Sequence, residues 1–135
     1  MSTTADRYMS KADRAAKSAR TLLDVGDIDG ACDRAYYAMF NAARSALIVS
    51  GATISAATTK THSGLIGAFG LHLVKTNLIA ADLGSVINKV EHLRRLADYT
   101  GEPISLEEAT WAVEQAASFV ATLRQTFMPE NDAMI

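Results

Sequence analysis

The stretch Asp33–Ile48, DRAYYAMFNAARSALI, is the strongest indication of the fold in this chain of 135 residues. Between positions 35 and 49 only Asn41, Arg44 and Ser45 are clearly polar. A helix that is apolar around most of its circumference is buried on most of its sides. The run is too short and too often interrupted by polar residues to cross a membrane. It therefore predicts the central helix of a bundle, or a helix shared with a second subunit.

The rest of the chain favours the all-α class, because no stretch alternates apolar and polar residues as a half-buried strand does. Short connections between successive helices favour an up-and-down bundle of four to five helices. We expect one domain over residues 1–128, a flexible tail over 129–135 and an irregular connector, GATISAATTKTH, over 51–62. The helices are expected at about Thr4–Asp24, Asp29–Ser50, Thr61–Lys75, Ala80–Tyr99 and, after an N-cap at Ser105, to about Phe127.

Composition narrows the function classes. The chain is 49% hydrophobic and 21% charged, which excludes a disordered chain. A net charge of -2 gives no overall attraction to nucleic acid, so any RNA contact needs a local patch. The N-terminus is polar and the single cysteine, Cys32, has no internal disulfide partner. We expect a cytoplasmic protein without membrane attachment, metal or cofactor, because no metal-ligand cluster or phosphate-binding glycine loop is present.

Arg94 is the main candidate for a functional side chain. On a helix over 80–99 it lies at the edge of the apolar face, and Glu91 and Asp98 lie within side-chain reach on the same flank. An arginine presents a planar fork of donors that can grip phosphate at two points. The central helix has one polar stripe fit to face water, which would line one cleft with Arg94 if the two helices pack side by side; it consists of Arg34, Tyr37, Asn41, Arg44 and Ser45.

The remaining candidates are two histidines, His92 and His62, together with Tyr99 and Lys60. His92 and Tyr99 share the side of their helix away from Arg94, and a histidine with a pKa near neutrality can act as a general acid or base. His62 begins the third expected helix, where a free backbone N–H and the nearby Lys60 could meet an anion. The alternatives are a solvated histidine at position 92 and a structural ion pair at Arg94.

Three segments, in the order RAYYAMFNAARSALI, KTHSGLIGAFG and LRRLADYTGEPISLEEA, resemble the HEPN superfamily, in particular its small stand-alone prokaryotic members. The resemblance implies a four- or five-helix bundle that commonly forms a homodimer. It also implies a gene neighbour of the minimal nucleotidyltransferase type, with which many such proteins act as a toxin–antitoxin pair. Active members are metal-independent ribonucleases, whose motif is an arginine followed after four to six residues by a histidine at the dimer interface.

The chain departs from that ribonuclease motif. Counted from Arg94, the histidine should stand at position 99, 100 or 101, where the sequence has Tyr99, Thr100 and Gly101. Arg94–Tyr99 instead resembles the Arg-x-x-Ala-Asp-Tyr form of the stand-alone subgroup. We therefore expect a binding or regulatory module rather than an enzyme, the alternatives being a ribonuclease with a non-standard base and a purely structural interaction protein. The predicted nucleotide- or phosphate-binding residues are Arg94, Asp98, Tyr99, Arg44, Asn41, Tyr37, Lys60 and His62, and the catalytic candidates are Arg94, Tyr99 and His92.

Overall fold

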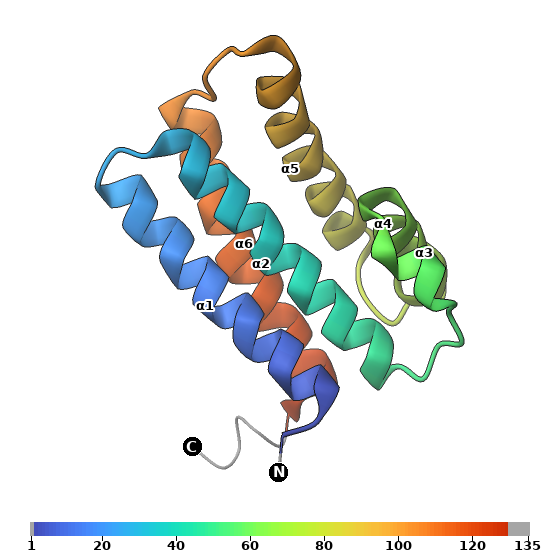
Figure 1. The fold of residues 1–135 in the computed structure, drawn as a ribbon. Helices are drawn as coiled ribbons and strands as arrows, with labels where there is room; N and C mark the ends of the chain where they lie inside the picture. Colours follow the sequence, from blue (N-terminus) through green and yellow to red (C-terminus); the bar gives the residue numbers. More distant parts are fainter. Residues whose placement is uncertain (1, 130–135) are drawn as a thin grey trace.

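A computed structural model describes residues 2–129, and within them all regular structure is helical (Figure 1). The prediction of an all-α bundle is confirmed. The predicted tail lies outside the described residues from position 130 onward. In chain order the elements are α1 (Thr4–Asp24), α2 (Ile28–Val49), α3 (Ala56–Lys60), α4 (His62–Phe69), the π-helix η1 (Gly70–Val74), α5 (Ala81–Thr100) and α6 (Leu106–Phe127).

Helix α2 is the centre of the bundle, as its composition predicts. Helices α1 and α6 run along it on one side, and α5 and α4 pack against it on the other (Figure 1). Ala35, Ala38, Ala42 and Ala46 are fully buried, and their small side chains allow the neighbouring helices to approach closely. Within residues 2–129 no helix is long and apolar enough to span a membrane.

The main helices begin and end where the local chemistry predicts. The side chain of Ser105 accepts a hydrogen bond from the Glu108 N–H and the Glu108 side chain accepts one from Ser105, which is the capping box expected at α6. Gly26, with φ of +87°, makes the turn between α1 and α2. On α5, Ile87 and Val90 are buried on the predicted apolar face.

The segment from 51 to 75 differs from the prediction of one connector and one long helix. The connector contains α3, and the expected helix consists of α4 and η1, which ends on a bond from the Lys75 N–H to the Gly70 carbonyl. The Thr61 side chain accepts a hydrogen bond from the Gly64 N–H and starts α4. The Thr58 carbonyl lies so close to Gly64 that a Cβ atom would collide with it. Gly64 is therefore needed for the close approach of α3 to α4.

The prediction that Ser45 belongs to the water-facing stripe of α2 is wrong. The residue is fully buried, and its hydroxyl donates a hydrogen bond of 2.7 Å to the carbonyl of Ala5 at the start of α1. A buried hydroxyl needs such a partner, since leaving it unpaired costs free energy. Ser45 thus joins α1 to α2 and has no contact with solvent.

Candidate functional site

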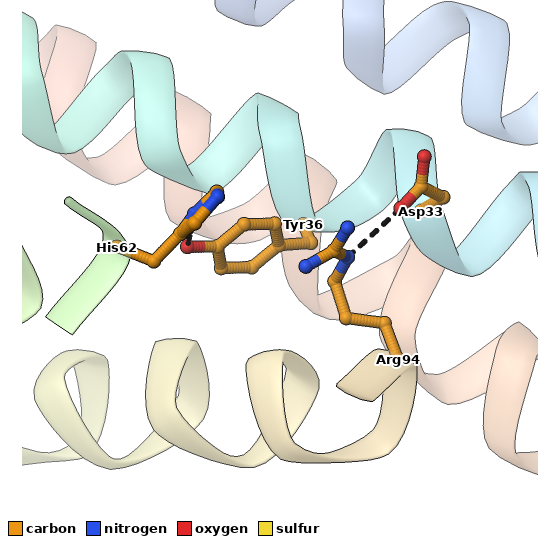
Figure 2. Close-up of polar contacts among 4 residues, drawn as sticks. All are labelled: Asp33, Tyr36, His62 and Arg94. Atoms are coloured by element: carbon orange, nitrogen blue, oxygen red, sulfur yellow. Dashed lines mark hydrogen bonds and ion pairs between the residues drawn. The ribbon is translucent and has the colours of Figure 1, made fainter. Parts of the chain in front are cut away.

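Arg94 reaches from α5 across to α2. Its Nε donates a hydrogen bond of 2.8 Å to Oδ1 of Asp33, and the two charges form an ion pair. The guanidinium carbon lies 4.9 Å from the centre of the Tyr36 ring and 5.4 Å from that of Tyr37. Figure 2 shows Nε facing Asp33 and the guanidinium group beside the Tyr36 ring. The side chain is 18% exposed, so solvent reaches part of it.

The environment keeps Arg94 charged. Burial by itself lowers its pKa, but the hydrogen bond and the negative charge of Asp33 outweigh that effect and the pKa lies above the ordinary value. The ring faces of Tyr36 and Tyr37 also attract the cation. Within residues 2–129 neither terminal nitrogen of the guanidinium group has a hydrogen-bond acceptor. Arg94 is thus a cation held in a fixed position, with N–H donors on its terminal nitrogens that are available to a ligand.

The partners predicted for Arg94 on its own helix are not the ones it uses. Glu91 pairs with Arg95 instead, at 3.6 Å, and Asp98 is exposed. The reason is that Arg94 points toward α2, where Asp33 meets it. Asp98 still lines a hollow of about 330 Å³ with Arg94 and Asp33. Asp29 lines it too, so this side of Arg94 is acidic and the opposite side is aromatic.

His62, at the start of α4, meets the buried Tyr36 on α2. The Tyr36 hydroxyl and Nδ1 of His62 form a hydrogen bond of 2.7 Å (Figure 2). The imidazole ring also lies 5.9 Å from the Tyr37 ring and 5.2 Å from the Phe40 ring, measured between centroids. Because Tyr36 holds Nδ1, only Nε2 of His62 remains for a further partner. Arg94 and His62 therefore lie on either side of one tyrosine.

Tyr36 keeps its proton in this environment. Burial raises the pKa of its hydroxyl and the negative charge of Glu91 raises it further, although Arg94 acts in the opposite direction. One carboxylate oxygen of Glu91, Oε2, is buried and has no hydrogen-bond partner among the described residues. A buried unpaired carboxylate oxygen is costly.

The predicted residues of α2 fall into two places rather than one cleft. Tyr37 lies beside Arg94, whereas Arg44 is two turns further along α2 and lines a separate hollow with Lys60. Asn41 is partly exposed between them, and its side chain makes no hydrogen bond within residues 2–129. The prediction that Arg44 lines one cleft with Arg94 is therefore wrong. The cause is that Arg44 turns toward Tyr8 of α1 and Thr59 of α3.

The other two candidates lie away from Arg94. His92 lines a hollow of about 980 Å³ between α5 and α6, with Trp111 on its other wall. Tyr99 is 89% exposed, and its side chain has no hydrogen bond or ring contact within the described residues. Neither residue joins Arg94 as a neighbouring acid or base in this chain. The opposite side of α5, on which the sequence places His92 and Tyr99, faces away from α2.

Two residues of the site were missed or misjudged in the sequence. Asp33 and Tyr36 are absent from the candidates that the sequence predicts. Asp33, Tyr36, Tyr37, Phe40 and Arg44 recur at helical spacing on one side of α2, and this spacing is the signal that could have found Asp33 and Tyr36. Cys32 is buried, and burial raises the pKa of its thiol to about 11, so it is not a ready nucleophile. No cluster of three or more metal-ligating side chains occurs among residues 2–129.

Comparison with known proteins gives a consistent assignment. A family model described as the HEPN domain matches residues 5–126, nearly the whole described chain. A UPF0332 protein of Gloeobacter violaceus is 32% identical over 114 residues, which are 83% of this chain and 86% of that protein.

Two proteins of Methanocaldococcus jannaschii that carry the name "putative toxin" are also similar. One is 35% identical over 92 residues, 68% of this chain and 65% of that protein. The other is 25% identical over 127 residues, 93% of this chain and 83% of that protein.

Proposed function

The chain belongs to the HEPN domain family, and from that premise we propose that it is the HEPN component of a toxin–antitoxin type of system and binds the phosphate of a nucleotide or RNA through Arg94. The relatives named as toxins support the first part of the proposal. The second part rests on the chemistry around Arg94. A homodimer and a partner of the nucleotidyltransferase type belong to the same proposal and come from the family resemblance.

The observation that carries the proposal is the state of the Arg94 guanidinium group. Nε is held by Asp33, the plane is steadied by Tyr36 and Tyr37, and both terminal nitrogens lack an acceptor among the described residues. Two terminal N–H groups in a fixed plane match two oxygens of one phosphate. An ion pair needed only for stability contributes little at a partly exposed site, so stability is a weak reason for this arrangement.

A second cation near Arg94 supports the proposal that an anion binds there. Arg34 is exposed, and its guanidinium carbon lies 5.3 Å from the centre of the Tyr37 ring, which is also in contact with Arg94. The phosphate would approach from the side of these rings, because the opposite side of Arg94 carries Asp29, Asp33 and Asp98. Repulsion by these carboxylates leaves one direction of approach.

Replacement of one arginine at a time tests the proposal. Arg94→Lys keeps the charge but removes the planar fork, and Arg95→Lys makes the same change at the exposed neighbour. We expect Arg94→Lys to weaken binding of a fluorescent single-stranded RNA by about tenfold, the effect of losing one charge-assisted hydrogen bond. Arg95→Lys should bind like the wild type. Equal affinities of the wild type and both variants would favour the purely structural interaction protein.

Ribonuclease activity is a second candidate function, favoured by the Tyr36–His62 contact. In metal-independent cleavage of RNA, the ribose 2′-oxygen loses a proton to a base and attacks the phosphorus. The bond from phosphorus to the 5′-oxygen then breaks, and the 5′-oxygen takes up a proton. Nε2 of His62 is the nitrogen left to exchange protons, because Nδ1 is bonded to Tyr36. Arg94 lies against the same tyrosine and would stabilise the charge that develops on the phosphate.

A comparison of two histidines distinguishes the binding module from the ribonuclease. RNA is incubated with the protein and a metal chelator, and the fragments are separated by size. Ribonuclease activity predicts cleavage that is lost in Arg94→Gln and His62→Gln but retained in His92→Gln. If RNA binding depends on Arg94 but no cleavage occurs at high protein concentration, the protein is a binding module and not a ribonuclease. Equal loss in His92→Gln would contradict the role of His62.

A further inference from the structure

A second group of cationic side chains lies in a hollow between α1, α2 and α3, where Arg44 is the central residue. Its Nη1 donates a hydrogen bond of 3.3 Å to the Tyr8 hydroxyl, and its Nη2 donates to the Thr59 carbonyl. The guanidinium carbon lies 5.0 Å from the centre of the Tyr8 ring. The hollow measures about 400 Å³, and Lys60 at the end of α3 lines it with an exposed side chain.

The charges that line this hollow are of one sign. Arg44 and Lys60 are its charged residues, and the other residues that line it are neutral. Among them, Thr4, Thr59 and Tyr8 carry hydroxyl groups. The hollow beside Arg94, by contrast, carries three aspartates. An anion therefore meets less repulsion at Arg44 and Lys60 than in the hollow next to Arg94.

A continuous row of rings joins the two places. The Arg94 guanidinium carbon lies 5.4 Å from the Tyr37 ring, and the Tyr37 ring lies 5.9 Å from that of His62. The His62 ring lies 5.2 Å from that of Phe40, which lies 5.1 Å from the guanidinium carbon of Arg44. From Tyr37 to Arg44 the helix advances by two turns, about 10.5 Å at the usual rise per residue.

We propose that Arg44 and Lys60 form a second phosphate subsite and that the ligand is a single-stranded phosphodiester chain lying across α2 from Arg94 to Arg44. This inference rests on the proposed function, because Arg94 supplies the first subsite. Two cationic places two helical turns apart match a ligand whose negative charges repeat along its length, rather than a single phosphate. Single strands bind where cations alternate with aromatic rings, and in this row Tyr37 and His62 are partly exposed whereas Phe40 is buried. Lys60 makes the direct contact, since its side chain is exposed whereas Arg44 is half-buried and held in place by Tyr8 and Thr59.

The dependence of affinity on ligand length tests the second subsite. Binding of a labelled dinucleotide and a labelled decanucleotide of the same sequence is measured by fluorescence anisotropy. Arg44 ties α1 to α3, so its replacement risks the fold, and the exposed Lys60 is changed instead. We expect Lys60→Glu to weaken decanucleotide binding by about fivefold or more, because it removes an attraction and adds a repulsion. Dinucleotide binding should stay unchanged.

The control makes the same charge change elsewhere. Lys17 is exposed on α1 and lines none of the hollows described above, so Lys17→Glu should bind both ligands like the wild type. The second subsite is overturned if the wild type binds both lengths equally, or if Lys60→Glu loses both lengths equally. If the protein in those cases still binds the oligonucleotides in a way that depends on Arg94, the proposed function stands. If it binds neither length, both proposals are wrong. Decanucleotides of ribose and deoxyribose distinguish RNA from DNA as the source of the chain.

Discussion

The hydroxyl of Tyr36 and Nδ1 of His62 lie 2.7 Å apart and join the middle of α2 to the first residue of α4. Tyr36 is fully buried, so its hydroxyl has no access to bulk water as an alternative partner. We expect Tyr36→Phe to lower the free energy of unfolding by about 1–2 kcal/mol, because His62 loses its partner and α4 loses a tie to α2.

Tyr37→Phe is the matched control for this change. The Tyr37 hydroxyl has no hydrogen bond within residues 2–129, so its removal should alter the free energy of unfolding by less than about 0.5 kcal/mol. Urea denaturation followed by circular dichroism measures both variants. Equal effects of the two substitutions would show that the Tyr36–His62 bond does not contribute to stability.

Arg94 and Asp33 are predicted to be coupled energetically. A double-mutant cycle with Arg94→Gln and Asp33→Asn should give a coupling energy of about 1 kcal/mol, since Asp33 is 46% exposed and solvent weakens the pair. The Arg95–Glu91 pair, in which Arg95 is 67% exposed, should give about 0.3–0.5 kcal/mol. Unfolding of each set of variants in urea provides the numbers. A coupling no larger for Arg94 than for Arg95 would contradict the fixed position of the guanidinium group.

Two glycines of α4 should respond to alanine in opposite directions. A Cβ at Gly64 collides with the Thr58 carbonyl, so Gly64→Ala should destabilise the protein by about 1–3 kcal/mol. At Gly67 a Cβ meets no atom within 4 Å of the described structure, and Gly67→Ala should stabilise the helix by roughly 0.5–1 kcal/mol. Midpoints of thermal unfolding give the sign of each change. Stabilisation by Gly64→Ala would show that α3 does not pack against α4 in this way.

The sequence predicted the long helices because their signals are local. Caps such as Ser105 and the turn at Gly26 lie within a few residues of the helix ends they define. The segment from 51 to 75 escaped because its geometry depends on a close approach between Thr58 and Gly64 and on an i→i+5 bond at Gly70. Neither feature follows from the periodicity of apolar residues. The low helix propensity of glycine indicates only that each glycine weakens a helix.

The site was predictable only in part, for a related reason. Arg94 stands out by its place at the edge of an apolar face, which is a property of one helix. Its actual partner, Asp33, and the Tyr36–His62 contact depend on how α5 and α4 pack against α2. Tyr99 and His92 share a side of α5 in the sequence, yet the packing leaves Tyr99 in solvent and directs His92 to α6. Helical periodicity cannot predict contacts between helices.

The dependence of single-stranded RNA binding on salt tests the central role of Arg94 most directly. If Arg94 neutralises one phosphate, a plot of log affinity against log salt concentration should be shallower for Arg94→Gln than for the wild type, by about 0.7 in slope, the value per phosphate for single strands. Arg95→Gln should keep the wild-type slope. A slope for Arg94→Gln identical to that of the wild type would contradict the account, because it would mean that no phosphate contact was lost.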